Sequence, residues 1–96
     1  MNKADTEKLT RVFKVLSIDT RVKMLELLKE RSLCVNALAR ILNITQAAVS
    51  QHLRILRDAD ILKAEKRGYF VHYSVNEKVL KRWREMAEEL LNMDVK

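Results

Sequence analysis

One segment, residues 45–62, constrains the fold more than any other part of the chain. Val49, Leu53 and Leu56 lie at positions i, i+4 and i+7, so they fall on one face of a helix. Such a face is buried, while the opposite face is left to solvent or to a partner. We therefore predict a helix here, with Thr45 as its N-cap, because a threonine hydroxyl can accept a free backbone N–H.

The opposite face of this helix carries side chains that suit a nucleic-acid surface. Its residues are Gln46, Ala47, Ser50, Gln51, Arg54 and Arg57. Amide, hydroxyl and guanidinium groups bond base edges and phosphates, and alanine can contact a thymine methyl. Residues 31–57 contain no carboxylate, although the whole chain has thirteen. We therefore expect this helix, with its Thr45 cap, to contact double-stranded DNA; an ordinary solvated face is the alternative.

A β-hairpin is predicted directly after this helix. Residues 61–65 and 69–75 alternate in the manner of strands and flank residues 66–68, with the glycine at the tip. Alternation in the second strand predicts one buried face and one partly wet face, with His72 on the wet side. The side chains expected to contact DNA from this hairpin are Lys66, Arg67 and Tyr69. Such contacts strengthen binding without selecting sequence, and a plain solubilising role is the alternative.

The other apolar patterns predict four more helices. The first carries Leu9, Val12, Phe13 and Leu16. The second carries Val22, Leu25 and Leu28, supplemented by Met24 and Leu27. The third, from about Cys34, carries Val35, Leu38, Ala39 and Leu42. The last, from about Glu77, carries Leu80, Trp83, Ala87, Leu90 and Leu91.

Short polar residues mark the helix ends. Ser17 or Asp19 can cap the second helix. Asn43 falls where the chain must turn before Thr45, and asparagine tolerates the left-handed conformation. The order is α-α-α-α-β-β-α, a mainly α fold with a small β-hairpin, which is a winged helix-turn-helix. We expect residues 1–96 to form a single winged-helix DNA-binding domain.

The first and last helices carry more apolar side chains than so small a core is expected to bury. The residues concerned are Leu9, Val12, Phe13, Leu16, Leu80, Trp83, Ala87, Leu90 and Leu91. A homodimer formed through these two helices explains the surplus, and two-fold symmetry would set two DNA-contacting helices about 34 Å apart. A monomer with a complete internal core is the alternative.

Charge and composition narrow the class of protein. The net charge is +6 and favours an acidic partner. Residues 54–67 hold five Lys or Arg against three acidic residues, whereas residues 85–94 hold four acidic residues and no basic one. No apolar run approaches the roughly 20 residues that span a bilayer, and the N-terminus lacks a signal-peptide core. A single cysteine suits a reducing interior, so we expect a cytoplasmic protein without a membrane segment.

Three further residues, Cys34, His52 and His72, have side chains that could serve as ligands or sensors. Cys34 is favoured as a small buried side chain, with a redox or soft-metal sensor as the alternative. His52 is expected to make a structural hydrogen bond. His52 and His72 lie on different elements without ligand-like spacing, so we predict no metal site.

Several segments together resemble the ArsR/SmtB family of small dimeric repressors. Residues 16–28, LSIDTRVKMLELL, are similar to the opening segment of the family, and residues 32–42 to its third helix. Residues 45–62, TQAAVSQHLRILRDADIL, match the recognition-helix pattern, and the KRGYFVHYSV hairpin resembles the wing. The resemblance covers residues 10–92 and implies a winged-helix homodimer on a two-fold symmetric operator.

The chain also departs from that family. Metal sensors of the family carry two cysteines around one residue in the third helix, but Asn36 stands at the second position here. Residues 76–96 contain no His or Cys, which the zinc site of other members requires. Asp19 replaces the proline expected near the start of the second helix. These departures leave metal sensing unsupported.

The function predicted from the sequence is that of a DNA-binding transcriptional regulator. We expect a repressor that binds a two-fold symmetric operator as a homodimer and is released by an unidentified effector, if by any. The alternative is a winged-helix module for protein–protein assembly, although exposed aromatics would then be expected on the recognition helix. No clustered nucleophile and base, glycine-rich phosphate loop or paired carboxylates are present, so we expect neither catalysis nor a cofactor.

Overall fold

The computed structural model describes residues 1–93. The elements are α1 (Lys3–Val15), α2 (Asp19–Glu30), β1 (Leu33–Cys34), α3 (Val35–Leu42), α4 (Gln46–Asp58), β2 (Leu62–Arg67), β3 (Phe70–Val75) and α5 (Glu77–Leu91). The predicted domain ends at Lys96, so its last three residues lie outside the described range. One of them is Asp94, which belongs to the acidic segment 85–94. The mainly α fold with a β-hairpin before the last helix is confirmed.

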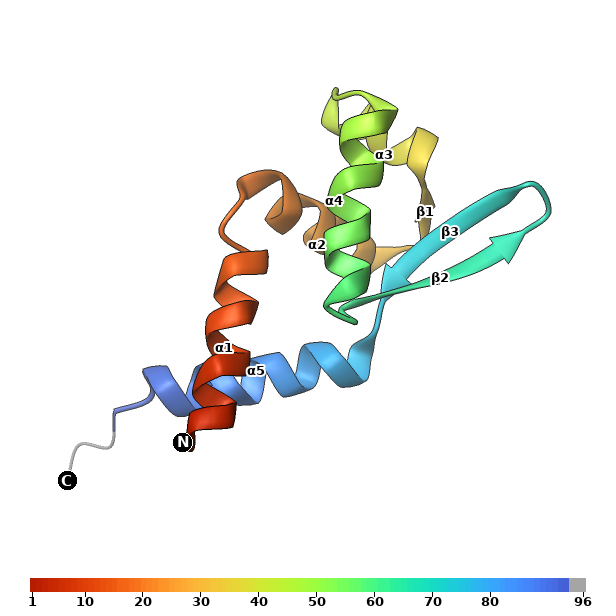
Figure 1. The fold of residues 1–96 in the computed structure, drawn as a ribbon. Helices are drawn as coiled ribbons and strands as arrows, with labels where there is room; N and C mark the ends of the chain where they lie inside the picture. The colour runs from red at the N-terminus through yellow and green to blue at the C-terminus, as the bar shows by residue number, and fades with distance from the viewer. Residues whose placement is uncertain (94–96) are drawn as a thin grey trace.

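The elements divide the molecule into two sides. Figure 1 shows α2, α3 and α4 together, with the β2–β3 hairpin projecting away from them. On the other side α1 crosses α5, and these two helices contact each other. The helices of the DNA-binding motif and the helices predicted to form the dimer are therefore separated within one chain.

The inward face of α4 supplies the centre of the core. Val49 and Leu56 are fully buried and Leu53 is 2% exposed, as their spacing predicts. They pack with the equally buried Met24 of α2 and Leu38 of α3. Burying one such side chain stabilises the fold by about 1.5–3 kcal/mol, so α4 is held firmly against α2 and α3.

The buried stripe of α2 contains Met24, Leu25 and Leu28, as predicted, but differs from the prediction at its start. Val22, predicted to face the core, is 38% exposed, and the buried positions begin instead at Arg21. The Arg21 guanidinium donates to the carbonyl oxygens of Val15 and Lys14, at 2.5 and 3.2 Å, at the end of α1. An arginine that serves as a buried cap does not register in an apolar pattern, which explains the error.

The predicted cap of α2 is also wrong. Its N-cap is Ile18, which makes no side-chain cap hydrogen bond. The Ser17 hydroxyl donates instead to the Lys14 carbonyl at 2.7 Å, so it serves the end of α1. Asp19 is the first residue of α2 and lies 3.8 Å from the Lys23 ammonium. An acidic residue in the first turn is still favourable there because of the helix dipole.

The sheet has a strand that the sequence did not predict. Leu33 and Cys34 form β1, which pairs antiparallel with Tyr73 and His72 of β3. The strand order is therefore β1-β3-β2. Two residues are too few to show an alternating pattern, so the periodicity could not reveal this strand.

The turn of the helix-turn-helix is confirmed. Asn43 has φ 55° and ψ 48°, the left-handed conformation, and the next amide, of Ile44, donates to the Ala39 carbonyl at 3.2 Å. The Thr45 hydroxyl accepts a hydrogen bond from the Ala48 amide at 3.0 Å and so caps α4. These two local contacts set the direction in which α4 leaves α3.

Gly68 lies at the tip of the hairpin, as predicted, but the turn is shorter than residues 66–68 and begins later. Arg67 pairs with Phe70, so Gly68 and Tyr69 form a two-residue turn and Lys66 lies within β2. Gly68 has φ 62°, and no positive φ occurs at Tyr69. Glycine at the first of two turn positions is the pattern of a type II′ turn, which matches the twist of the strands.

The predicted alternation of buried and wet faces fails in the outer half of β3. Phe70 is 53% exposed and Val71 is 39% exposed, although they lie on opposite faces. Only at Val75, beside the helices, is the strand fully buried. The hairpin projects beyond the body of the protein (Figure 1), so neither face of its outer half has a layer to pack against.

The left-handed turn residue provides a test of this fold. We expect Asn43→Ala to lower the free energy of unfolding by about 1 kcal/mol, because alanine avoids the left-handed region. Asn43→Gly should be close to neutral, since glycine adopts that region freely but gains entropy in the unfolded chain. Urea denaturation of both variants checks this, and equal stability of the two would contradict a left-handed residue at this turn.

Candidate DNA interface

The exposed face of α4 presents every recognition-helix side chain predicted from the sequence. The exposed side chains are Thr45, Gln46, Ala47, Ser50, Gln51, Arg54 and Arg57. Of the intervening apolar residues, Val49, Leu53 and Leu56 are buried, whereas Ile55 is 38% exposed. These exposed side chains combine amide and guanidinium donors with a small apolar group, which are the groups that bond base edges in a major groove. The geometry of α4 therefore fits a recognition helix.

The surface of the helix-turn-helix is positively charged. Its cations are Arg31, Arg40, Arg54 and Arg57, and each of them is exposed. None of them forms an ion pair within residues 1–93. Cations without internal partners can exchange their counterions for phosphates, which is the main source of affinity for DNA.

The wing lies beside this surface. A groove between α4 and β3 has Tyr73 on the β3 side, and its α4 side is lined by Ser50, Leu53, Arg54, Arg57 and the acidic Asp58. Farther out, Lys66 and Arg67 are exposed on β2, and Tyr69 is 99% exposed at the tip. The hairpin that carries the predicted wing residues thus follows the recognition helix directly in the chain and lies beside it.

One wing cation is partly neutralised within the chain. The Arg67 guanidinium lies 3.4 Å from the Glu65 carboxylate. Exposed pairs of this kind contribute little free energy, so a phosphate can displace the carboxylate.

Phe70 is half exposed beside Tyr69 at the end of the hairpin. The sequence did not predict this exposure, because strand alternation gives no sign that the hairpin projects.

Both histidines have a buried ring nitrogen without a partner. Nδ1 of His52 and Nδ1 of His72 make no hydrogen bond within the described residues, so the structural hydrogen bond expected of His52 is not observed. Burial, and secondarily the Arg21 guanidinium, lowers the pKa of His52 below its ordinary value of 6.5. The neutral form of His52 therefore fits the folded protein.

Cys34 is half buried at the N-cap position of α3. It lies directly across from His72 in the β1–β3 pair, and both line a shallow cavity with Arg40 and Phe70. Within residues 1–93, no group of three or more His, Cys, Asp or Glu side chains could hold a metal ion. A sensor role for Cys34 stays a prediction.

The residues predicted to form the dimer face divide into two groups. Leu9, Val12 and Trp83 are at most 9% exposed and belong to the core of the single chain. The others retain surface and are here called the dimer surface: Phe13, Leu16, Leu80, Ala87, Leu90 and Leu91. The sequence could not separate the groups because both fall on the apolar faces of α1 and α5.

This arrangement defines a winged helix-turn-helix protein with a basic, exposed recognition helix. The comparisons with known proteins agree. Residues 19–64 match the model of the bacterial regulatory protein, arsR family. The chain is 39% identical over 69 residues to the transcriptional repressor SdpR of Bacillus subtilis (strain 168), across 72% of this chain and 77% of the relative.

Solved structures share the fold. HlyU from Vibrio cholerae N16961 has a TM-score of 0.77 at 27% identity, over 95% of this chain and 98% of that one. A homodimeric winged helix-turn-helix DNA-binding domain, Mb0332 from Mycobacterium bovis, has a TM-score of 0.74 at 24% identity, over 97% of this chain and 90% of that one.

The chain belongs to the ArsR family and is a DNA-binding transcriptional regulator. The resemblance seen in the sequence is thereby confirmed. This family consists of regulators rather than enzymes, as predicted. Within residues 1–93, no helix is long and apolar enough to cross a membrane.

The lowered pKa of His52 predicts how stability depends on pH. Below about pH 6.5 the unfolded chain takes up a proton at this residue more readily than the folded chain does. The free energy of unfolding should therefore fall as pH decreases from about 7.5 to 5.5. Urea denaturation across this pH range should show that His52→Gln loses less unfolding free energy than wild type does. An equal loss of unfolding free energy in wild type and His52→Gln would contradict the prediction.

Proposed function

We propose that the protein is a repressor that binds a two-fold symmetric operator as a homodimer, with α4 in the major groove and the wing on the adjacent backbone. One observation carries the proposal: from Gln46 to Arg57, α4 exposes a polar and basic face without a carboxylate, on a helix whose other face is buried in the core. A regulator of transcription acts where the chromosome lies, so we place the protein in the cytoplasm.

The side chains divide into two roles on this proposal. Gln46, Gln51 and Arg54 read bases, since glutamine bonds adenine and arginine bonds guanine through two hydrogen bonds. Ala47 contacts a thymine methyl. The remaining contacts orient the protein on phosphates without reading sequence, and they come from Thr45, Ser50, Arg57, Lys66, Arg67 and Tyr69.

Dimerisation is supported by apolar side chains that one chain leaves in water. Phe13 of α1 is 44% exposed, and Leu90 and Leu91 of α5 are 52% and 72% exposed. They lie on the α1–α5 side of the molecule, away from the recognition helix and the wing. A second copy on the dimer surface would cover them and would present two recognition helices to successive turns of the duplex.

The division of roles predicts two different binding defects. Gln51→Ala should reduce the preference for the operator by about 1–3 kcal/mol while leaving the salt dependence of binding unchanged. Lys66→Gln with Arg67→Gln should weaken binding to every duplex, and should lower the slope of log affinity against log salt by about 0.9 for each lost phosphate contact.

Fluorescence anisotropy with the upstream DNA of the protein's own gene and with a shuffled duplex measures both effects. Lys3→Gln with Lys81→Gln removes the same charge far from the interface and should leave the slope close to that of wild type. An unchanged slope in the wing variant would refute the wing contacts. The absence of binding to either duplex at about 0.15 M salt would instead favour the alternative function, a protein-assembly module.

The dimer surface predicts the assembly state in solution. The wild-type chain of 11.3 kDa should sediment at about twice that mass at micromolar concentration. Phe13→Glu with Leu91→Glu should give a monomer, because a dimer would bury two unpaired carboxylates per chain. Ile18→Glu with Val22→Glu alters exposed apolar residues outside this surface and should leave the dimer intact. A wild-type mass near one chain would exclude the proposed dimer.

A further inference from the structure

The recognition helix ends on a carboxylate. Asp58 is the last residue of α4 and is exposed. It follows Gln51 at i+7 and Arg54 at i+4, so it lies on the same stripe of the helix as these two proposed base-reading residues. No other residue of α4 is acidic. The face that is proposed to meet DNA therefore carries one negative charge, at its C-terminal end.

No contact within residues 1–93 explains the Asp58 carboxylate. It forms no ion pair there and accepts no side-chain hydrogen bond. An acidic residue in the last turn of a helix is also unfavourable, because the helix dipole is negative at that end. We therefore expect this carboxylate to act at the surface and not in holding the fold together.

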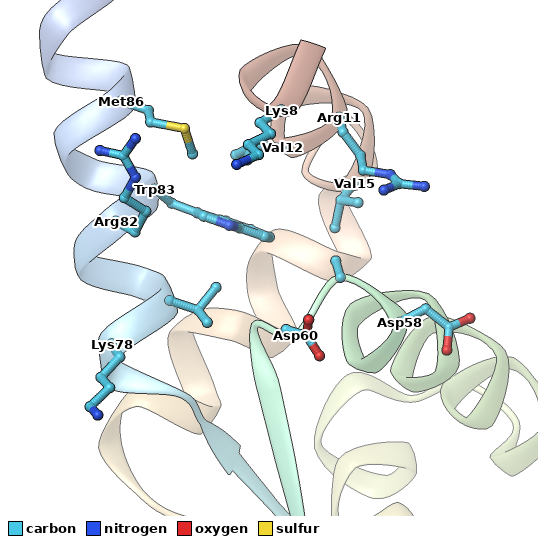
Figure 2. A pocket seen from close by; sticks show the side chains of 12 residues that line it. Lys8, Arg11, Val12, Val15, Asp58, Asp60, Lys78, Arg82, Trp83 and Met86 are labelled. Carbon is cyan, nitrogen blue, oxygen red and sulfur yellow. The ribbon is translucent and has the colours of Figure 1, made fainter. Parts of the chain in front are cut away.

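The corner where α4 leads into β2 has two sides. On one side a cavity of about 370 Å³ opens between this corner, α1 and α5, and both Asp58 and Asp60 border it. On the other side Asp58 borders the groove between α4 and β3, together with Arg54 and Arg57, whereas Asp60 does not. Figure 2 shows the Asp58 carboxylate directed away from Trp83 and from the cavity. The charge of Asp58 is thus on the side of the arginines.

A guanidinium on the recognition helix has two kinds of partner on DNA. It can pair with a phosphate, which carries a negative charge and occurs in every sequence, or with the edge of a guanine, which is uncharged. Arg54 forms no ion pair within residues 1–93, so both partners are open to it. Pairing with phosphates would raise binding to every duplex and would lower the preference for the operator.

A carboxylate one helical turn from Arg54 changes this competition. Four residues of a helix rise about 6 Å, so a phosphate bound at Arg54 would lie at about that distance from Asp58. In water, two unit charges of like sign at that distance weaken binding about threefold, and more where water is excluded. The uncharged edge of a guanine does not meet this repulsion. The carboxylate therefore acts against one partner of Arg54 and not against the other.

We propose that Asp58 is a specificity-determining residue, whose carboxylate keeps DNA phosphates away from Arg54 so that Arg54 pairs with guanine in the operator. This role rests on the proposed function, in which α4 lies in the major groove. The first residues of a recognition helix meet the base edges, so Asp58, about three turns further on, lies toward the phosphates that border the groove. Specificity is a difference between two affinities, and Asp58 increases it by disfavouring the wrong partner.

Fluorescence anisotropy with the upstream DNA and the shuffled duplex, at about 0.05 M salt, tests this role. Asp58→Asn should raise the affinity for the shuffled duplex about tenfold, because a dimer carries two such carboxylates. The affinity for the upstream DNA should rise no more than about threefold, so the preference should fall about threefold or more. Both effects should shrink as the salt is raised to about 0.3 M, since the repulsion is screened.

Two further variants are matched controls. Asp60→Asn removes the same charge two residues away, outside the groove. Asparagine also tolerates the left-handed conformation that Asp60 adopts, with φ 62°. Asp58→Glu retains the charge at the recognition face. Both variants should keep the wild-type preference for the upstream DNA.

Three binding results would overturn the role of Asp58. They are an unchanged preference in Asp58→Asn, an equal rise for both duplexes, and a loss of affinity for the upstream DNA alone. The last result would make Asp58 an acceptor for a cytosine amino group. Lower stability of Asp58→Asn in urea would assign the carboxylate to the fold and would overturn the role as well. A wild-type protein that binds neither duplex would overturn the proposed function, and this inference with it, before any variant is compared.

Discussion

The burial of one face of α4 is the constraint on which the rest of the structure depends. Val49, Leu53 and Leu56 fill the centre of the core, so the rotation of this helix about its axis is fixed. Its polar face must then point outward, whatever that face contacts. The recognition surface is thus rigid before DNA arrives, and binding does not have to order it.

Arg21 joins the two sides of the molecule. Its guanidinium satisfies the Val15 and Lys14 carbonyls at the end of α1, while its helix packs in the core under α4. Burial, and secondarily the same cation, lowers the pKa of His52 on α4. One buried arginine therefore connects α1, which carries part of the dimer surface, with the helix that carries the DNA contacts.

Much of this fold could be predicted because strong local signals agree. The apolar spacing of α4, the cap at Thr45 and the left-handed Asn43 each depend on neighbouring residues, and all three are confirmed. The errors arose where contacts between distant parts of the chain determine the local structure. β1 exists only because β3 lies beside it, Arg21 is buried only because the end of α1 needs donors, and Val71 is exposed only because the wing projects. The recognition face lies on one helix, so it could be predicted. The cavity joins three elements, so it could not.

The core is less deeply buried at the crossing of α1 and α5 than around α4. A chain of 96 residues buries a limited fraction of its surface, and here the most deeply buried side chains gather around α4. The crossing of α1 and α5 is left with a thinner core, built around Leu9, Val12 and Trp83. It is open on one face to the cavity and on another to the dimer surface. We therefore expect local opening of the fold to begin at this helix pair rather than at α4.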